Sequence, residues 1–279
     1  MPSDPPSVPS SDPPSADRPR LFARLDERAA GIVAYVTLDN ARRLNAMNSA
    51  LMEEFVATMA SLAGEDRLRA VVLAGAGPKS FIVGADIDEM AGIRNPADAR
   101  AFISRLHRCC DAIRSFPVPV IARIQGYCFG GGLEIAASCD LRIASEAASF
   151  GMQEVKLGIP SVIEAALLPM LVGFGRAREI MYLGETFTAR EALEWGLVER
   201  VVEASSLDAA VETCIAALLT AKPGAVRRQK QLMRQWEQLP LAAAVRAGID
   251  AFAATYETDE PVAAMREFLA ARKARKPSR

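Results

Sequence analysis

The segment from Val120 to Asp140 constrains this chain most, because an apolar run leads into three adjacent glycines that open a helical pattern. The run V-I-A-R-I at 120–124 is typical of a buried strand, and the glycines stand at 130–132. Adjacent glycines let backbone N–H groups face a ligand without interfering side chains. A helix that begins there adds unpaired N–H donors and the positive end of its dipole. The segment therefore predicts a site for a negatively charged oxygen, bound or developing in a transition state.

Glu134 lies on the first predicted turn of that helix, where its carboxylate is placed to act on the group that carries the oxygen. The alternative is a tight packing turn beside an ordinary exposed glutamate. A phosphate-binding P-loop is poorly supported, because no G-x-x-x-x-G-K-[ST] sequence is present. The G-A-G turn at 75–77 lacks the third glycine of a dinucleotide fingerprint, since position 80 is Ser80.

Composition narrows the class of protein. The 279 residues are 51% hydrophobic, enough for one large domain or a domain with a smaller lobe. The 33 basic and 34 acidic side chains nearly cancel, so neither nucleic acid nor a membrane surface is an expected partner. No apolar run approaches the ~18 residues that span a bilayer. Five cysteines without C-x-x-C spacing, and an N-terminus unlike a signal peptide, favour a cytoplasmic protein with reduced thiols.

The chain divides into three parts by pattern. Residues 1–20 are rich in Pro, Ser and Asp and are predicted to form a disordered tail. From 21 to 204 strand and helix patterns alternate, which predicts an α/β core with parallel strands. Strands are expected at 31–39, 69–74 and 120–124, and helices after Asn48 and at 96–115. The region 205–279 shows only helical patterns, at 207–220, 225–236, 241–255 and 261–274.

His107 is the only histidine, so a metal cluster or a Ser-His-Asp triad would have to use it. No G-x-S-x-G elbow is present, and the cysteines lack the spacing of a metal site. We therefore expect His107 to be structural, and we expect no metal site.

Four stretches together carry a resemblance to a known family. They are L-N-A-M at 44–47, F-I-V-G-A-D-I at 81–87, G-Y-C-F-G-G-G-L-E at 126–134 and A-S-F-G-M-Q-E-V-K-L-G-I-P at 148–160. In this order and spacing the chain resembles the crotonase (enoyl-CoA hydratase/isomerase) superfamily from about residue 21 onward. The resemblance implies an α/β fold, a crotonase-like spiral of ββα turns with a C-terminal helical oligomerisation lobe. It also implies a homo-trimer, often paired into a hexamer.

The resemblance implies an acyl-CoA thioester as substrate and no separate cofactor, since coenzyme A is part of the substrate. The oxyanion hole falls on the backbone N–H groups of Ala85 and Gly131, and the acid/base pair falls on Glu134 and Glu154. Arg42, Arg43 and Lys273 are candidates for the CoA phosphates. The substrate- and CoA-binding positions implied by the motifs are Arg43, Ala46, Val83, Asp86, Ile87 and Gly130.

The chain departs from the family after Pro160, where typical hydratases carry a glycine-rich loop and this chain reads S-V-I-E-A-A. Fewer glycines predict a bulkier and stiffer wall at the acyl end of the site. The change introduces Glu164, which we include among the predicted substrate-binding residues as a third acid facing the substrate. The alternative places Glu164 on the first turn of a helix, where the dipole favours a carboxylate.

Two glutamates favour hydration of an enoyl-CoA, because one base suffices to shift a double bond. An enoyl-CoA isomerase, or an acyl-CoA hydrolase or C–C lyase of the same superfamily, is kept open by the altered loop at 161–166. A CoA-binding scaffold without catalysis is the non-enzyme alternative, and the presence of both glutamates counts against it.

Overall fold

The computed structural model describes residues 19–274, which form two sheets with helices around them. The large sheet has the order β1-β2-β3-β5-β7-β10 and the small sheet the order β4-β6-β8-β9. The predicted tail lies almost entirely outside the described residues. The strands of the large sheet are β1 (Arg20–Arg28), β2 (Gly31–Asp39), β3 (Leu68–Gly75), β5 (Val120–Ile124), β7 (Leu141–Ser145) and β10 (Arg200–Val202). Those of the small sheet are β4 (Ser80–Ile82), β6 (Tyr127–Phe129), β8 (Ser149–Gly151) and β9 (Thr186–Thr188).

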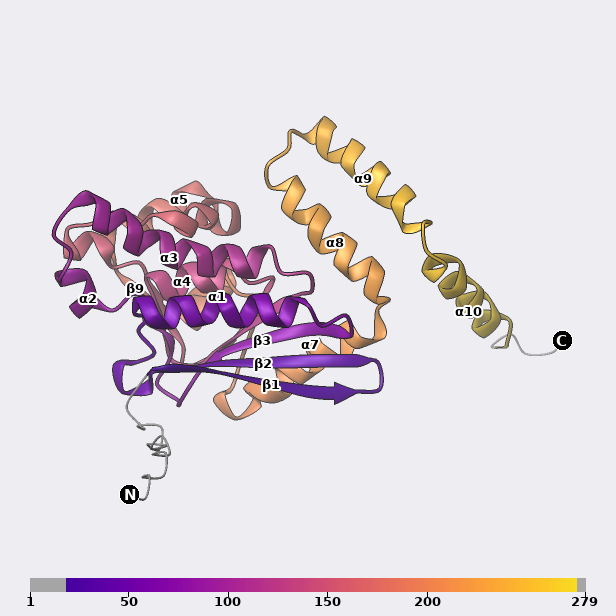
Figure 1. Ribbon diagram of the computed structural model, residues 1–279, viewed down its shortest axis with the longest axis horizontal. Helices are drawn as coiled ribbons and strands as arrows, with labels where there is room; N and C mark the ends of the chain where they lie inside the picture. Colours follow the sequence, from indigo (N-terminus) through magenta and orange to yellow (C-terminus); the bar gives the residue numbers. More distant parts are fainter. Residues whose placement is uncertain (1–18, 275–279) are drawn as a thin grey trace, which may run out of the picture.

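The helices alternate with these strands and then continue alone (Figure 1). Four short 3₁₀ turns are η1 (Ala41–Arg43), η2 (Glu154–Leu157), η3 (Ile163–Leu167) and η4 (Ala204–Ser206). The helices between strands are α1 (Ser49–Ala63), α2 (Ile87–Ala91), α3 (Pro96–Arg114), α4 (Gly131–Ser138), α5 (Leu168–Leu183) and α6 (Ala189–Glu194). The C-terminal helices are α7 (Leu207–Thr220), α8 (Pro223–Trp236), α9 (Leu241–Thr255) and α10 (Glu260–Ala274).

The connectivity is a spiral of ββα turns. The consecutive pairs β3/β4, β5/β6 and β7/β8 each give one strand to the large sheet and one to the small sheet, and helices follow each pair. Strands β3, β5 and β7 run parallel, as do β4, β6 and β8. The predicted α/β spiral with parallel strands is therefore confirmed. Strand β1, which pairs antiparallel with β2, was not predicted, because most of its side chains are polar and exposed.

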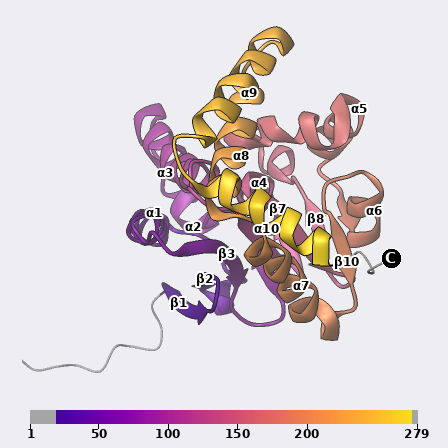
Figure 2. The same ribbon diagram turned by 90° about the vertical axis from the view of Figure 1, so that its right-hand side faces the viewer.

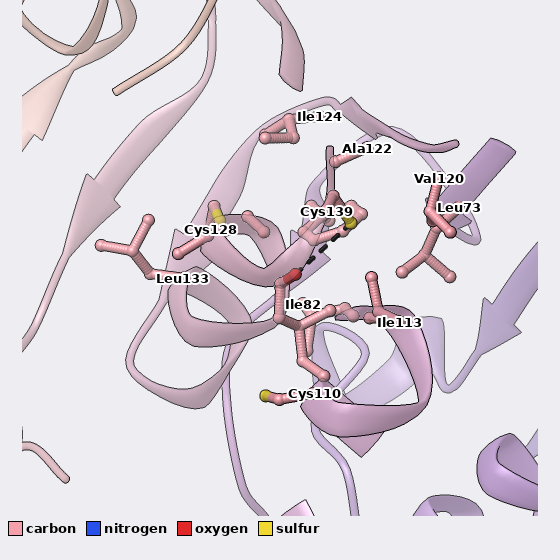
Figure 3. Packing of buried hydrophobic residues seen from close by; sticks show 14 of the residues in the cluster. Leu73, Ile82, Cys110, Ile113, Val120, Ala122, Ile124, Cys128, Leu133 and Cys139 are labelled. Atoms are coloured by element: carbon pink, nitrogen blue, oxygen red, sulfur yellow. Dashed lines mark hydrogen bonds between the residues drawn. The ribbon is translucent and has the colours of Figure 1, made fainter. Parts of the chain in front are cut away.

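The core lies between the sheets and helices α1, α3 and α4. Helix α1 buries the predicted apolar face, and the side chain of Asn48 caps it by accepting the N–H of Leu51 over 2.9 Å. Figure 3 shows Cys110 on α3 and Cys139 packed among aliphatic side chains. The Sγ of Cys139 donates to the carbonyl of Ile135 over 3.4 Å. All five cysteines are free thiols and four are buried, as the sequence suggested.

Helix α7 covers the opposite face of the large sheet (Figure 2). Its buried Leu207, Val211 and Ile215 pack on Val33 and Val72 of the sheet. Figure 1 shows that α9 and α10 extend away from this body, whereas α8 contacts it through its buried Lys230. The helices that extend away from the core are therefore α9 and α10, although the helical region predicted from the sequence begins before α7.

Across residues 19–274, no single helix is long and apolar enough to cross a membrane. The segment η4–α7 and the helix α8 are long and apolar enough only when taken together, and the chain bends by 108° between them.

Candidate active site

The predicted oxyanion donors come from two loops that lie side by side. Gly84, after β4, has φ 101°, and Gly130, before α4, has φ 50°, a region that L side chains rarely adopt. A Cβ atom on Gly84 would lie 3.1 Å from the backbone nitrogen of Gly131, and one on Gly131 would lie 3.7 Å from that of Ala85. No acceptor within residues 19–274 is paired with the N–H of Ala85 or Gly131. The glycines thus let two unpaired N–H groups approach each other.

The L-N-A-M stretch supports one of these loops. The N–H of Met47 donates to the carbonyl of Gly84 over 2.8 Å, and the N–H of Asp86 donates to the carbonyl of Met47 over 3.0 Å. Both bonds flank Ala85, so they fix the direction of its N–H. Ala46 is buried beside this bridge. The stretch therefore holds the loop in place from behind.

Ala85 and Gly131 both line a cavity of about 880 Å³. Seven of the predicted site residues line it: Val83, Ala85, Ile87, Gly130, Gly131, Glu134 and Glu154. Most of the other lining side chains are apolar, including Leu44, Met90, Phe102, Ile103, Leu106, Tyr127, Phe129, Leu157, Ile159 and Val162. A cavity of this kind suits an apolar chain attached to a polar group.

Glu134 is a buried carboxyl on the first turn of α4, with 3% of its surface exposed. Its Oε1 accepts the N–H of Ala165 over 3.1 Å. Burial, and next the negative charge of Glu154, raise the pKa of Glu134 to about 8, against the opposing N–H of Ala165. A carboxyl with such a pKa exchanges a proton readily near neutral pH.

Glu154 reaches the same cavity from η2. Its Oε1 is placed so that a Cβ atom on Gly130 would lie only 2.6 Å away, and its Oε2 accepts the hydroxyl of Ser161 over 2.9 Å. The negative charge of Glu154 also raises the pKa of Glu134. Two carboxyl groups from separate elements therefore flank the N–H pair.

Arg43 and Asp86, predicted to bind CoA, do not line this cavity. The Nη1 of Arg43 pairs with Asp86 over 2.9 Å and with Asp88 over 2.8 Å. Asp86 also caps α2 by accepting the N–H of Glu89 over 3.1 Å. Arg43 is half exposed, so in this structure it joins η1 to α2 at the surface.

Glu164 does not line the cavity as a third acid, the role for which it was included among the predicted substrate-binding residues. It is 4% exposed on the first turn of η3 and is absent from the cavity lining. Its Oε1 lies 2.9 Å from Nδ1 of His107 and 3.7 Å from Nη1 of Arg114. The geometry is that of the alternative, a carboxylate on a helical turn, and its contacts with His107 and Arg114 of α3 are the physical reason for its direction.

The sequence did not reveal the wall that α3 contributes. Phe102, Ile103 and Leu106 of α3 line the cavity beside Arg100, and the rings of Tyr127 and Phe129 stack at 5.2 Å on another side. The spacing of apolar residues on α3 indicated an amphipathic helix. That pattern does not distinguish residues that face the core from residues that face a cavity, so the sequence did not predict this wall of the cavity.

The spiral of ββα turns, with two inward N–H groups and two carboxyl groups on one apolar cavity, defines the crotonase class of proteins. The chain belongs to the enoyl-CoA hydratase/isomerase family, whose model matches residues 27–276.

Known relatives agree with this membership. The short-chain-enoyl-CoA hydratase of Clostridium acetobutylicum is 36% identical over 244 residues, which are 87% of this chain and 93% of that protein. The crotonyl-CoA hydratase of Syntrophomonas wolfei is 32% identical over 243 residues, again 87% and 93%. The crystal structure of enoyl-CoA hydratase from Bacillus anthracis matches with a TM-score of 0.83 at 33% identity, covering 89% of this chain and 96% of that one.

Proposed function

We propose that this protein is an enoyl-CoA hydratase, a hydro-lyase that adds water across the 2,3-double bond of an enoyl-CoA to give a 3-hydroxyacyl-CoA. The observation that carries the proposal is the presence of Glu134 and Glu154 on the same cavity as the N–H groups of Ala85 and Gly131. Coenzyme A enters as part of the substrate, and the reaction needs no other cofactor.

In this mechanism the N–H groups of Ala85 and Gly131 donate to the thioester oxygen, which gains negative charge as the enolate forms. Glu134, in its ionised form, takes a proton from water as the water oxygen bonds to C3. The two carboxyl groups share one proton, which is on Glu154 when Glu134 is ionised. Glu154 delivers this proton to C2, and the enolate returns to the thioester. The raised pKa of Glu134 favours its role as base, because a base of higher pKa binds the water proton more strongly.

The names of the relatives support a short acyl chain, since two of them act on short-chain enoyl-CoA or crotonyl-CoA. The apolar walls supplied by α3 and by the segment around Ile159 fit such a chain. We therefore propose crotonyl-CoA as a substrate of this enzyme and as the first one to test.

We propose a homo-trimer or hexamer in the cytoplasm. Helices α9 and α10 expose large apolar side chains to solvent: Leu241, Val245, Ile249, Phe252, Phe268 and Leu269. Contiguous exposed apolar surface of this kind supports association with a further copy. Five free cysteines support a reducing compartment.

The test is the loss of enoyl absorbance with crotonyl-CoA and longer 2-enoyl-CoAs. Wild type is compared with Glu134→Gln and Glu154→Gln, and Glu194→Gln serves as matched control because its carboxylate pairs with Arg190 at the surface of α6. Removal of a general acid or base costs about 10²- to 10⁴-fold, so we expect both site variants to lose turnover and the control to keep it. Retained turnover in Glu134→Gln would exclude the mechanism. Absence of turnover on every 2-enoyl-CoA, with CoA esters still bound, would favour the isomerase, hydrolase or lyase reactions instead.

A further inference from the structure

We propose that Glu164 is a positioning residue whose contacts with His107 and Arg114 hold the turn η3, so that the N–H of Ala165 stays on the carboxylate of Glu134. The proposal rests on the proposed function in one respect, the role of Glu134 as base. It assigns a purpose to the only histidine of the chain and to the acid at the departure from the family's loop.

The turn η3 begins in a strained conformation. Ile163 has φ 41°, in the left-handed region that a β-branched side chain rarely enters. Typical hydratases carry glycines in this stretch, and glycine adopts such a φ without steric conflict. A strained residue persists only where the surrounding structure overdetermines it. Something outside the turn must therefore hold Ile163 in place.

The side chain of Glu164 provides that hold. It is buried and directed at α3, where Nδ1 of His107 lies 2.9 Å from one carboxylate oxygen and 3.2 Å from the other. Arg114, one end of α3, adds a cation 3.7 Å away and is itself anchored to Glu237. Helix α3 buries Cys109 and Cys110 in the core, so it is a rigid support. Because Glu164 is buried, loss of these contacts would leave an unpaired carboxylate, which is costly.

The next residue transmits this hold to the site. The N–H of Ala165 is shared between the carbonyl of Val162, at 2.9 Å, and Oε1 of Glu134, at 3.1 Å. A shift of the turn would remove this donor from the catalytic carboxyl and move Val162, which lines the cavity. The contacts thus run from α3 through Glu164 and Ala165 to Glu134 without Glu164 touching the substrate.

The test uses Glu164→Gln with enoyl-CoA kinetics and a rescue. Misplacement of a catalytic group by about 1 Å costs about 100-fold, so we expect kcat to fall by about 10- to 100-fold with KM changed little. Ile163→Gly added to Glu164→Gln removes the strain, and we expect it to restore most of kcat. Ile163→Ala is the matched control: it shortens the side chain but keeps an L residue at positive φ, so it should restore less. If Glu164 contacted the substrate instead, Glu164→Gln would raise KM, and no substitution at Ile163 would restore the activity.

A second measurement does not depend on turnover. Amide hydrogen exchange over residues 160–168 of the ligand-free protein should accelerate in Glu164→Gln and in His107→Ala, and return toward wild type with Ile163→Gly. Glu53→Gln, which breaks the exposed pair between Glu53 and Arg105 of α3, should leave exchange unchanged.

The two proposals fail in different ways. Exchange that accelerates as expected in a wild-type protein without hydratase activity would support the positioning role and overturn the proposed function. Unchanged exchange in both Glu164→Gln and His107→Ala, or failure of Ile163→Gly to rescue an active enzyme, would overturn the positioning role.

Discussion

The carboxylate of Glu154 occupies the space beside Gly130 that any other residue would fill with its side chain. A Cβ atom on Gly130 would lie 2.6 Å from Oε1 of Glu154, closer than real Cβ contacts come. Gly130 also has φ 50°. The absence of a side chain at Gly130 therefore allows the backbone conformation that directs the next N–H group, and it leaves room for the carboxylate of Glu154.

Gly130→Ala should lower kcat on an enoyl-CoA by about 100-fold, because it displaces Glu154 and misdirects the N–H of Gly131. Steady-state kinetics by enoyl absorbance measure this. Gly173→Ala is the matched control, since Gly173 has φ 75° but nothing within 4 Å of an added Cβ. An equal loss in the control would attribute the effect to backbone strain alone.

The activity should depend on pH through Glu134. Glu134 acts in its ionised form and Glu154 donates a proton, so the two carboxyl groups must hold one proton between them. That proton leaves with a pKa of about 8, so kcat/KM should fall as pH rises above about 8. Glu154→Gln removes a like charge, and the pKa of Glu134 should then fall. Infrared titration of the carboxyl groups in the ligand-free protein, with Glu134→Gln to assign the band, measures this without turnover. A pKa that stays in place in Glu154→Gln would contradict the coupling.

Glu134 should also make the free energy of unfolding depend on pH. Its folded-state pKa is raised from 4.5 to about 8, so between these values the folded state binds more protons than the unfolded state. The free energy of unfolding should therefore fall as pH rises from about 4.5 to about 8. Glu134→Gln removes this loss, by about 5 kcal/mol at most for such a shift. Thermal denaturation should show a higher Tm for the variant than for wild type at pH 9, with a smaller difference at pH 5.

Much of this fold could be predicted because its signals are local. The apolar run before the glycines, the spacing of the α1 face and the cap Asn48 each depend on neighbouring residues, and the structure confirms them. The family resemblance supplied the spiral, which local patterns alone do not define.

The features that the sequence did not predict depend on contacts between distant segments. The sequence left open whether Glu164 faces the substrate, because its partner His107 is 57 residues away on α3 and no local pattern relates the two. Strand β1 escaped prediction because its pairing with β2, not its own alternation, makes it a strand. The roles of Ala85, Gly131, Glu134 and Glu154 stay predictions that the kinetic tests address.

The proposed oligomer should depend on the apolar face of α9. Light scattering at micromolar concentration should give wild type the mass of a trimer or hexamer. Phe252→Asp, which places a charge at a side chain that is 66% exposed in the single chain, should reduce that mass. Phe22→Asp on β1 is a control of similar chemistry outside the helical lobe. A monomeric wild type would contradict the proposal.

Among the contacts that attach α8 to the core, the bonds of the buried Lys230 should contribute most. The Nζ of Lys230 donates to Asp140 over 2.6 Å and to the carbonyls of Ile113 and Val118 over 3.1 and 3.0 Å. Removal of one partner of a buried pair leaves the others unsatisfied, so Lys230→Met should lower the free energy of unfolding by about 3 kcal/mol. Denaturant unfolding measures this.

Lys222→Met is the matched comparison, because Lys222 of the preceding turn pairs with Glu267 at the surface. An exposed pair contributes less than about 1 kcal/mol. If both variants lost the same stability, burial of Lys230 would not be the reason for its effect, and its bonds would not be the largest contribution to the attachment of α8.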